Sequence, residues 1–75
     1  MKTPPRIFKN KLYEQFARLG KALAAPKRLE LLDLLSQGPR TVEALADLTG
    51  VTVANASQHL QVLRSARLVA SEKRG

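Results

Sequence analysis

One stretch of the chain combines amide and hydroxyl side chains with a complete lack of formal charge. No Asp, Glu, Lys or Arg occurs from Val53 to Leu63. A side-chain amide can form two hydrogen bonds to adenine, and a hydroxyl can form one to a base or a phosphate. A small apolar side chain can contact a thymine methyl. A merely solvated helix face would also be polar, but it would normally carry Glu and Lys. The composition favours a surface that reads DNA bases, and the residues expected to do so are Ala54, Asn55, Ser57, Gln58 and Gln61.

Basic residues flank this neutral stretch on both sides. The 75-residue chain has 13 Lys and Arg against 6 Asp and Glu, a formal net charge of +7. Eight basic residues stand in residues 1–28 against Glu14 alone, and four stand in residues 64–75 against Glu72 alone. Such flanks suit phosphate contacts, although charges scattered over solvated helices would give the same count. The residues expected at phosphates or in a β-wing are Arg28, Thr52, Arg64, Arg67, Lys73 and Arg74.

Arg28, His59 and the aromatic residues each have both a structural and a functional interpretation. For Arg28, an ion pair with Glu30 or Asp33 is the alternative to a phosphate contact. His59, the single histidine, falls at the edge of a buried helix face, so packing with one hydrogen bond is expected rather than metal binding or a pH switch. The aromatic residues near the N-terminus are expected in the core or a dimer interface rather than in a ligand pocket; they are Phe8, Tyr13 and Phe16.

Composition excludes several classes of function. The chain has no cysteine, which removes disulfides, thiolate metal sites and thiol catalysis. No apolar run approaches the ~20 residues of a membrane span, and no secretory signal stretch follows the first basic residues. Glycine-rich phosphate loops and nucleophile elbows are absent. We therefore expect a cytoplasmic, nucleoid-associated protein that is not an enzyme and holds no cofactor and no metal.

The expected elements begin with a flexible leader at residues 1–7. Apolar residues then recur at helical spacing from Phe8 through Leu12, Phe16, Leu19 and Leu23, and Pro26 ends this helix near residue 24 or 25. A second helix starts at Pro26 and ends near Gly38, with leucines over a wide face.

Two shorter helices follow, separated by a tight turn. Thr41 is expected to cap a third helix that stops at Gly50, and Thr52 to cap a fourth that fades near residue 66 or 67. In the fourth helix the residues expected to face inward are Val53, Ala56, Leu60 and Leu63. The small Ala46 allows the close crossing of a helix-turn-helix. Residues 68–70 are predicted to form a short strand that begins a hairpin.

Two segments resemble the ArsR/SmtB (arsenical-resistance repressor) family of bacterial winged-helix regulators. Ser57-Gln58-His59-Leu60, Leu63 and Ala66-Arg67-Leu68-Val69 are similar to the family pattern Ser-x-His-Leu-x-x-Leu-x-x-Ala-Gly-Leu-Val, with Arg67 in place of glycine. Residues 23–32, LAAPKRLELL, are similar to the family segment ahead of the motif. The resemblance covers about residues 12–75. Arg67 in the glycine position would either strain a left-handed cap or add a phosphate contact.

The resemblance implies a homodimer bound to double-stranded DNA. It implies that the first helix and a segment beyond residue 75 form the dimer interface, that the fourth helix reads the major groove, and that residues 68–71 start a β-wing. The family's metal sensors carry a cysteine pair on the third helix, and Thr41 and Glu43 stand at those positions here. The resemblance therefore implies no arsenic-type site in this chain.

The predicted fold is mainly α: a winged helix-turn-helix over residues 8–75, with about four helices and a wing cut short. The predicted function is a sequence-specific DNA-binding transcriptional regulator, a dimeric repressor on an inverted repeat. Two alternatives stay open. One is a winged-helix module that binds other proteins; the other is the DNA-binding part of a longer protein with a C-terminal sensor or enzyme domain.

Overall fold

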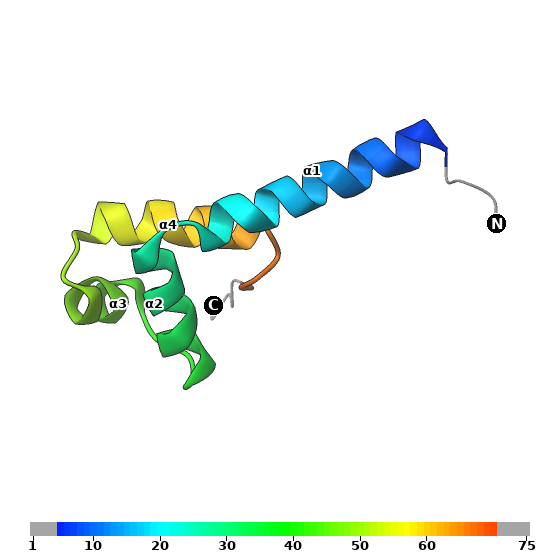
Figure 1. Ribbon diagram of the computed structural model, residues 1–75. Coiled ribbons are helices and arrows are strands. Elements are labelled where there is room, and N and C mark those ends of the chain that lie inside the picture. The colour runs from blue at the N-terminus through cyan, green and yellow to red at the C-terminus, as the bar shows by residue number, and fades with distance from the viewer. Residues whose placement is uncertain (1–4, 71–75) are drawn as a thin grey trace.

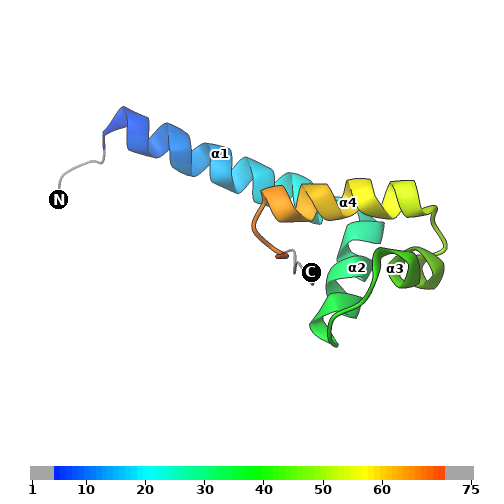
Figure 2. The ribbon, with the colours of Figure 1, turned by 180° about the vertical axis from the view of Figure 1, so that it is seen from behind.

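Four helices account for most of the chain in the computed structural model, which describes residues 5–70. They are α1 (Arg6–Leu23), α2 (Pro26–Ser36), α3 (Val42–Thr49) and α4 (Val53–Ser65). Helices α2, α3 and α4 pack into a small body, and α1 projects away from it (Figures 1 and 2). The Cα radius of gyration is 15.3 Å, whereas a compact domain of this length would have about 11 Å. The single chain is therefore elongated because of α1.

Local signals set most helix ends, as predicted. Pro26 occupies the first turn of α2, where its missing N–H leaves no hydrogen bond unmade. The side-chain oxygen of Thr41 accepts from the backbone N–H of Ala44, and that of Thr52 accepts from the N–H of Asn55, both at 3.1 Å. Each threonine thus satisfies one free donor at the start of its helix. The predicted caps are confirmed.

The turn between α3 and α4 depends on Gly50. Its φ of 72° lies in the left-handed region, which glycine adopts without a steric penalty. Its N–H donates to the carbonyl oxygen of Asp47, and the N–H of Val51 donates to that of Ala46. This pair of bonds is a Schellman termination, which ends α3 and redirects the chain into α4.

The same termination ends α4, but with an arginine in the left-handed position. Arg67 has a φ of 60°, and its N–H donates to the carbonyl oxygen of Arg64 at 2.9 Å. The N–H of Leu68 donates to that of Leu63, also at 2.9 Å. Since an L side chain costs about 1–2 kcal/mol in this conformation, the strained left-handed cap is present.

The core is small and lies among all four helices. Its buried residues are Ala22, Leu31, Leu45, Leu60 and Leu63. Ala22 is the only buried residue that α1 contributes among the residues described. Ala46 and Ala56 are also buried, which fits the close crossing of α3 and α4 expected from the small Ala46. A core of this size leaves much apolar surface uncovered in a single chain.

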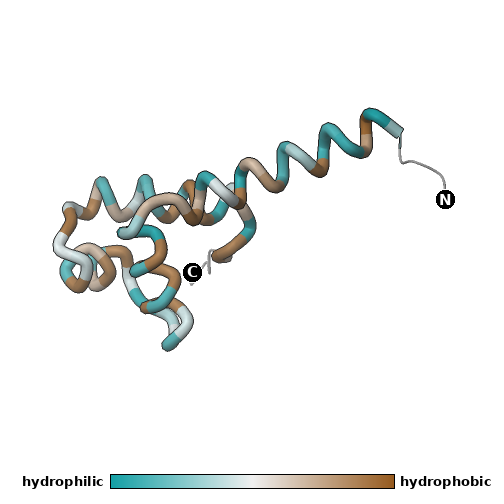
Figure 3. Tube along the Cα trace, in the orientation of Figure 1, coloured by the Kyte–Doolittle hydropathy of each residue, from teal (hydrophilic) through white to brown (hydrophobic). Residues whose placement is uncertain are grey.

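Several expectations about side chains and elements need correction. The apolar residues predicted on one helix face do recur along α1 (Figure 3), and the core alternative is wrong for four of the five, which are exposed in the single chain: Phe8, Leu12, Phe16 and Leu23. Val53 was expected to face inward and is 47% exposed. Arg6 and Ile7, placed in the leader by the sequence, belong to α1, and residues 1–4 lie outside the described part.

The strand predicted at residues 68–70 is also wrong as far as the structure describes it. These residues form a bend after α4, with no strand assigned. Leu68 is drawn back toward Leu63 by the termination of α4, and Leu68 and Val69 pack on the core. Within the described part of the chain, the one backbone hydrogen bond of residues 68–70 runs from Leu68 back to Leu63, and none joins them to another extended segment. A strand requires such a partner for its backbone groups. Within residues 5–70, no helix has the length and apolar character needed to cross a membrane.

Candidate nucleic-acid interface

Helix α4 buries one face and presents the other to solvent. Ala56, Leu60 and Leu63 anchor it in the body. The residues predicted to read bases gather on the outward side: Ala54, Asn55, Gln58 and Gln61 are exposed, and Ser57 is half-buried. The structure therefore brings these five residues together on one helix.

The polar groups on this face are not used within the described part of the chain. No hydrogen bond there engages the side-chain amides of Asn55, Gln58 or Gln61, so their donors and acceptors remain available. The hydroxyl of Thr52 accepts a bond from the backbone and keeps its own hydrogen for a further acceptor. Because α4 contains no carboxylate, nothing on the helix itself repels a polyanion.

The structure describes some of the basic residues expected at phosphates, but not those expected in the wing. Arg64 is exposed in the last turn of α4, and Arg67 is exposed directly after that helix. Both therefore lie at the C-terminal end of α4, away from Ala54 and Asn55 in its first turn. Lys73 and Arg74, expected in the wing, lie outside the described residues.

In this structure Arg28 does not form the ion pair with Glu30 or Asp33 that was one of its two expected roles, and its contact with a DNA phosphate stays a prediction. Its Nε donates to the carbonyl oxygen of Ala22 at 2.9 Å and its Nη2 to that of Lys21 at 2.6 Å, both at the end of α1. Its Nη1 lies 3.2 Å from Nδ1 of His59 in α4. The half-exposed guanidinium thus joins α1 to α4, and half-buried His59 has the single hydrogen bond predicted for it.

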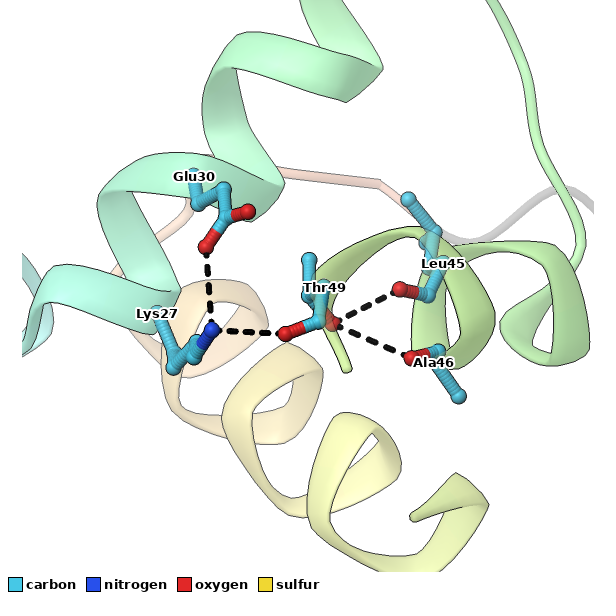
Figure 4. A network of polar contacts seen from close by, with 5 residues as sticks. All are labelled: Lys27, Glu30, Leu45, Ala46 and Thr49. Carbon is cyan, nitrogen blue, oxygen red and sulfur yellow. Dashed lines mark hydrogen bonds and ion pairs between the residues drawn. The ribbon is translucent and has the colours of Figure 1, made fainter. Parts of the chain in front are cut away.

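The ion pair considered for Arg28 is made by its neighbour. Lys27 Nζ lies 3.4 Å from Oε2 of Glu30. The same Nζ donates to the backbone carbonyl oxygen of Thr49 at 2.6 Å (Figure 4). The buried hydroxyl of Thr49 in turn donates to the carbonyl oxygen of Leu45 at 2.7 Å. This network joins the first turn of α2 to the last residue of α3, immediately before the turn that leads into α4.

Val53 was predicted to face the core, and the structure leaves it exposed beside the candidate reading face. It is the first residue of α4 and adjoins Ala54. Helical spacing grouped it with Ala56, yet nothing covers about half of its surface. Its position directly after the capping Thr52 is the signal that could have identified it, because the first turn of a reading helix faces the DNA.

The residues described contain no group of three or more His, Cys, Asp or Glu that could hold a metal ion. Thr41 and Glu43 lie at the start of α3, where Thr41 caps the helix and Glu43 adds a negative charge to its first turn. Both features stabilise a helix N-terminus.

The short helix α3, the left-handed glycine turn and the helix α4 with its exposed polar face, packed against α2, define a helix-turn-helix. Residues 25–71 match the family described as "Bacterial regulatory protein, arsR family". The chain belongs to the ArsR family, as its resemblance predicted.

Known proteins similar to the chain agree with this assignment. An HTH-type transcriptional regulator of Mycobacterium tuberculosis is 52% identical over 64 residues, 85% of this chain and 28% of the regulator. The transcriptional repressor SmtB of the same species is 35% identical over 72 residues, 96% of this chain and 50% of the repressor. The chain therefore spans half or less of these two relatives.

A solved structure covers the whole chain. It is the solution structure of a homodimeric winged helix-turn-helix DNA-binding domain from Mycobacterium bovis, described as a possible ArsR-family transcriptional regulator. The TM-score is 0.87 at 47% identity, over 100% of this chain and 68% of that domain. This similarity supports the arrangement of the four helices, including the projecting α1.

Proposed function

We propose that this chain is the DNA-binding domain of a bacterial transcriptional regulator that recognises a specific sequence in double-stranded DNA. The observation that carries the proposal is the outward face of α4. On this face the side-chain amides are exposed and have no hydrogen-bond partner within the described residues. The helix contains no carboxylate, and it follows directly on the turn of the helix-turn-helix. Its similarity to a DNA-binding domain of known structure supports the same function.

In this proposal the N-terminal half of α4 enters the major groove. Asn55 and Gln58 bond to base edges, with Gln61 and Ser57 beside them, and Ala54 contacts a thymine methyl. The hydroxyl of Thr52 bonds to a phosphate at one end of the helix. Arg64 and Arg67 neutralise phosphates at the other end, and Lys73 and Arg74 do so from the wing.

The regulator acts as a homodimer, and α1 forms part of the interface. Phe8, Leu12 and Phe16 leave a large apolar surface exposed along a helix that projects from the body. Burying that surface against a second copy would compensate for the small core. The similar solved domain is homodimeric.

We assign the protein a repressor's role in the cytoplasm, on the nucleoid, without enzymatic activity or a cofactor. Its similarity to a protein named a repressor supports the direction of control. A dimer on an inverted repeat would prevent transcription by covering the promoter. The DNA-binding domain is proposed to cover residues 8–75, and the start of α1 at Arg6 would extend it by two residues.

Selection of bound duplexes from a randomised DNA pool tests the proposal. We expect an inverted repeat to be enriched, with half-sites about one helical turn apart. The affinity should also fall steeply as salt rises, because most of the attraction comes from basic flanks that displace counterions. Recovery of no common sequence from the full-length protein would contradict the proposal.

A further inference from the structure

The attachment of α1 to the rest of the molecule is narrow. Only the C-terminal end of α1 reaches the body, and its N-terminal half extends freely (Figures 1 and 2). Ala22, the last residue but one of α1, is the one buried residue of this helix in the described part. The direction of the whole helix therefore depends on contacts made by its last turn.

Arg28 makes the polar contacts at this attachment. Two guanidinium nitrogens donate to the carbonyl oxygens of Lys21 and Ala22, at 2.6 and 2.9 Å. These carbonyls belong to the last turn of α1, where backbone acceptors are left free and the helix dipole favours a cation. The third nitrogen reaches Nδ1 of His59 at 3.2 Å. Since arginine only donates, Nδ1 accepts, and the ring hydrogen lies on Nε2.

The planar guanidinium holds its three nitrogens in a fixed fork, so the directions of its hydrogen bonds are coupled. One end of the fork is on α1, the helix proposed to form the dimer interface. The other end is on α4, the helix proposed to read DNA. A fork shared between them resists rotation of one helix relative to the other, which a single point contact does not.

We propose that Arg28 is a positioning residue that sets the direction of α1 relative to α4 and thereby the distance between the two reading helices of the dimer. This inference rests on the proposed function. An 18-residue helix is about 27 Å long, so a tilt of about 10° at its attached end displaces the far end by about 5 Å. A displacement of that size exceeds the ~3.4 Å rise of one base pair, so the tilt decides which half-site spacing the dimer fits.

The test compares Arg28→Ala and Arg28→Lys with wild type in the full-length protein. Arg28→Lys keeps the charge and loses the fork, and it serves as the second variant should Arg28→Ala fold poorly. Arg40→Ala is the matched control. Arg40 also donates to a carbonyl near the end of a helix, that of Leu34 at 3.2 Å, but its other hydrogen bond is to the side chain of Gln37, three residues away, and so joins no second helix.

The first measurement is affinity for the selected operator and for duplexes whose half-sites are one or two base pairs closer or farther apart. Wild type and Arg40→Ala should lose about tenfold or more at the wrong spacings. In both Arg28 variants, the affinities for the correct and the altered spacings should differ by less than about threefold. Both variants should bind an isolated half-site as well as wild type does. An equal loss at every spacing, or an unchanged spacing preference, would overturn the inference.

The second measurement does not require DNA binding. Because the chain has no cysteine, cysteines introduced at the exposed positions Lys11 and Ser65 can carry spin labels on α1 and α4. In dimers diluted with unlabelled chain, the Arg28 variants should broaden the distance distribution between the labels, and Arg40→Ala should not. A distribution as narrow as that of wild type would also overturn the inference. If the wild-type protein showed no sequence-specific DNA binding, the proposed function would be contradicted. The distance measurement would then still decide whether Arg28 sets the direction of α1.

Discussion

Lys27 Nζ lies 2.6 Å from the backbone carbonyl oxygen of Thr49, which joins the start of α2 to the end of α3. The carbonyl belongs to the last turn of α3, where acceptors are unpaired and a cation is favoured by the helix dipole. Gly50 follows at once, so this contact supports the turn that aims α4. An ordinary surface lysine thus has a structural role in the helix-turn-helix.

Replacing Lys27 with methionine should lower the free energy of unfolding by about 1–2 kcal/mol, because a charge-assisted hydrogen bond to a partly buried carbonyl is lost. Glu30→Gln removes only the exposed ion pair and should change the free energy of unfolding by less than about 0.5 kcal/mol. Urea denaturation of both variants measures the difference. Equal effects would mean that the bond to Thr49 adds nothing beyond the surface pair.

Arg67→Gly should stabilise the domain by about 0.5–1 kcal/mol. Glycine relieves the strain at a φ of 60°, and the greater freedom of glycine in the unfolded chain offsets part of the gain. Arg67→Ala removes the same side chain but keeps the strain, and it should not stabilise. Thermal or urea unfolding separates the two, and stabilisation by alanine as well would show that the strain is not the cause.

The same two variants test the proposed phosphate contact of Arg67. If its guanidinium neutralises a phosphate, both substitutions should weaken binding to all DNA sequences alike and reduce the salt slope by about 1. The slope is obtained from affinities at several salt concentrations. A slope unchanged in both variants would remove Arg67 from the interface.

Gln58→Ala should cost about 1–3 kcal/mol in binding to the selected operator and little on random DNA, since an amide that reads a base contributes only where its base is present. Ser65→Ala, on an exposed residue in the last turn of the same helix, serves as the control and should change neither affinity. Competition assays with both kinds of duplex measure the two affinities. Loss of the same size on random DNA would remove Gln58 from base readout.

Val53 should contact a thymine methyl group from the first turn of α4. Replacing that thymine with uracil removes only the methyl and should weaken wild-type binding by about 0.8 kcal/mol, or roughly fourfold. In Val53→Ala the same replacement should have little effect at that position. Affinities for duplexes with uracil at each thymine in turn measure the coupling, and a loss as large in the variant as in wild type at every position would rule the contact out.

Phe16→Glu should weaken the dimer at least tenfold, because it places a charge in the apolar surface proposed to join the two copies. Asn10→Glu adds the same charge on the opposite side of α1 by helical spacing and should leave the dimer intact. Sedimentation equilibrium of the full-length protein gives the dissociation constants. If neither variant differed from wild type, this face of α1 would lie outside the interface.

The features that the sequence determined by itself depend on short-range chemistry. Thr41 and Thr52 cap their helices through bonds to residues three positions later, and Gly50 ends α3 through its own backbone conformation. The candidate reading face follows from helical spacing once α4 has a start and a buried side. Such signals lie within one or two turns of helix, so the local sequence contains them completely.

The tertiary structure decided what depends on distant partners. The sequence offered Arg28 a phosphate or an acid as partner, and only the fold shows that its guanidinium reaches His59, 31 residues away, and the end of α1. Val53 has the spacing of a core residue, and only the packing shows that nothing covers half of it. The apolar residues of α1 fit a buried helix, yet a single chain leaves them exposed. Periodicity tells which residues share a face, whereas the other elements in space determine whether that face is covered.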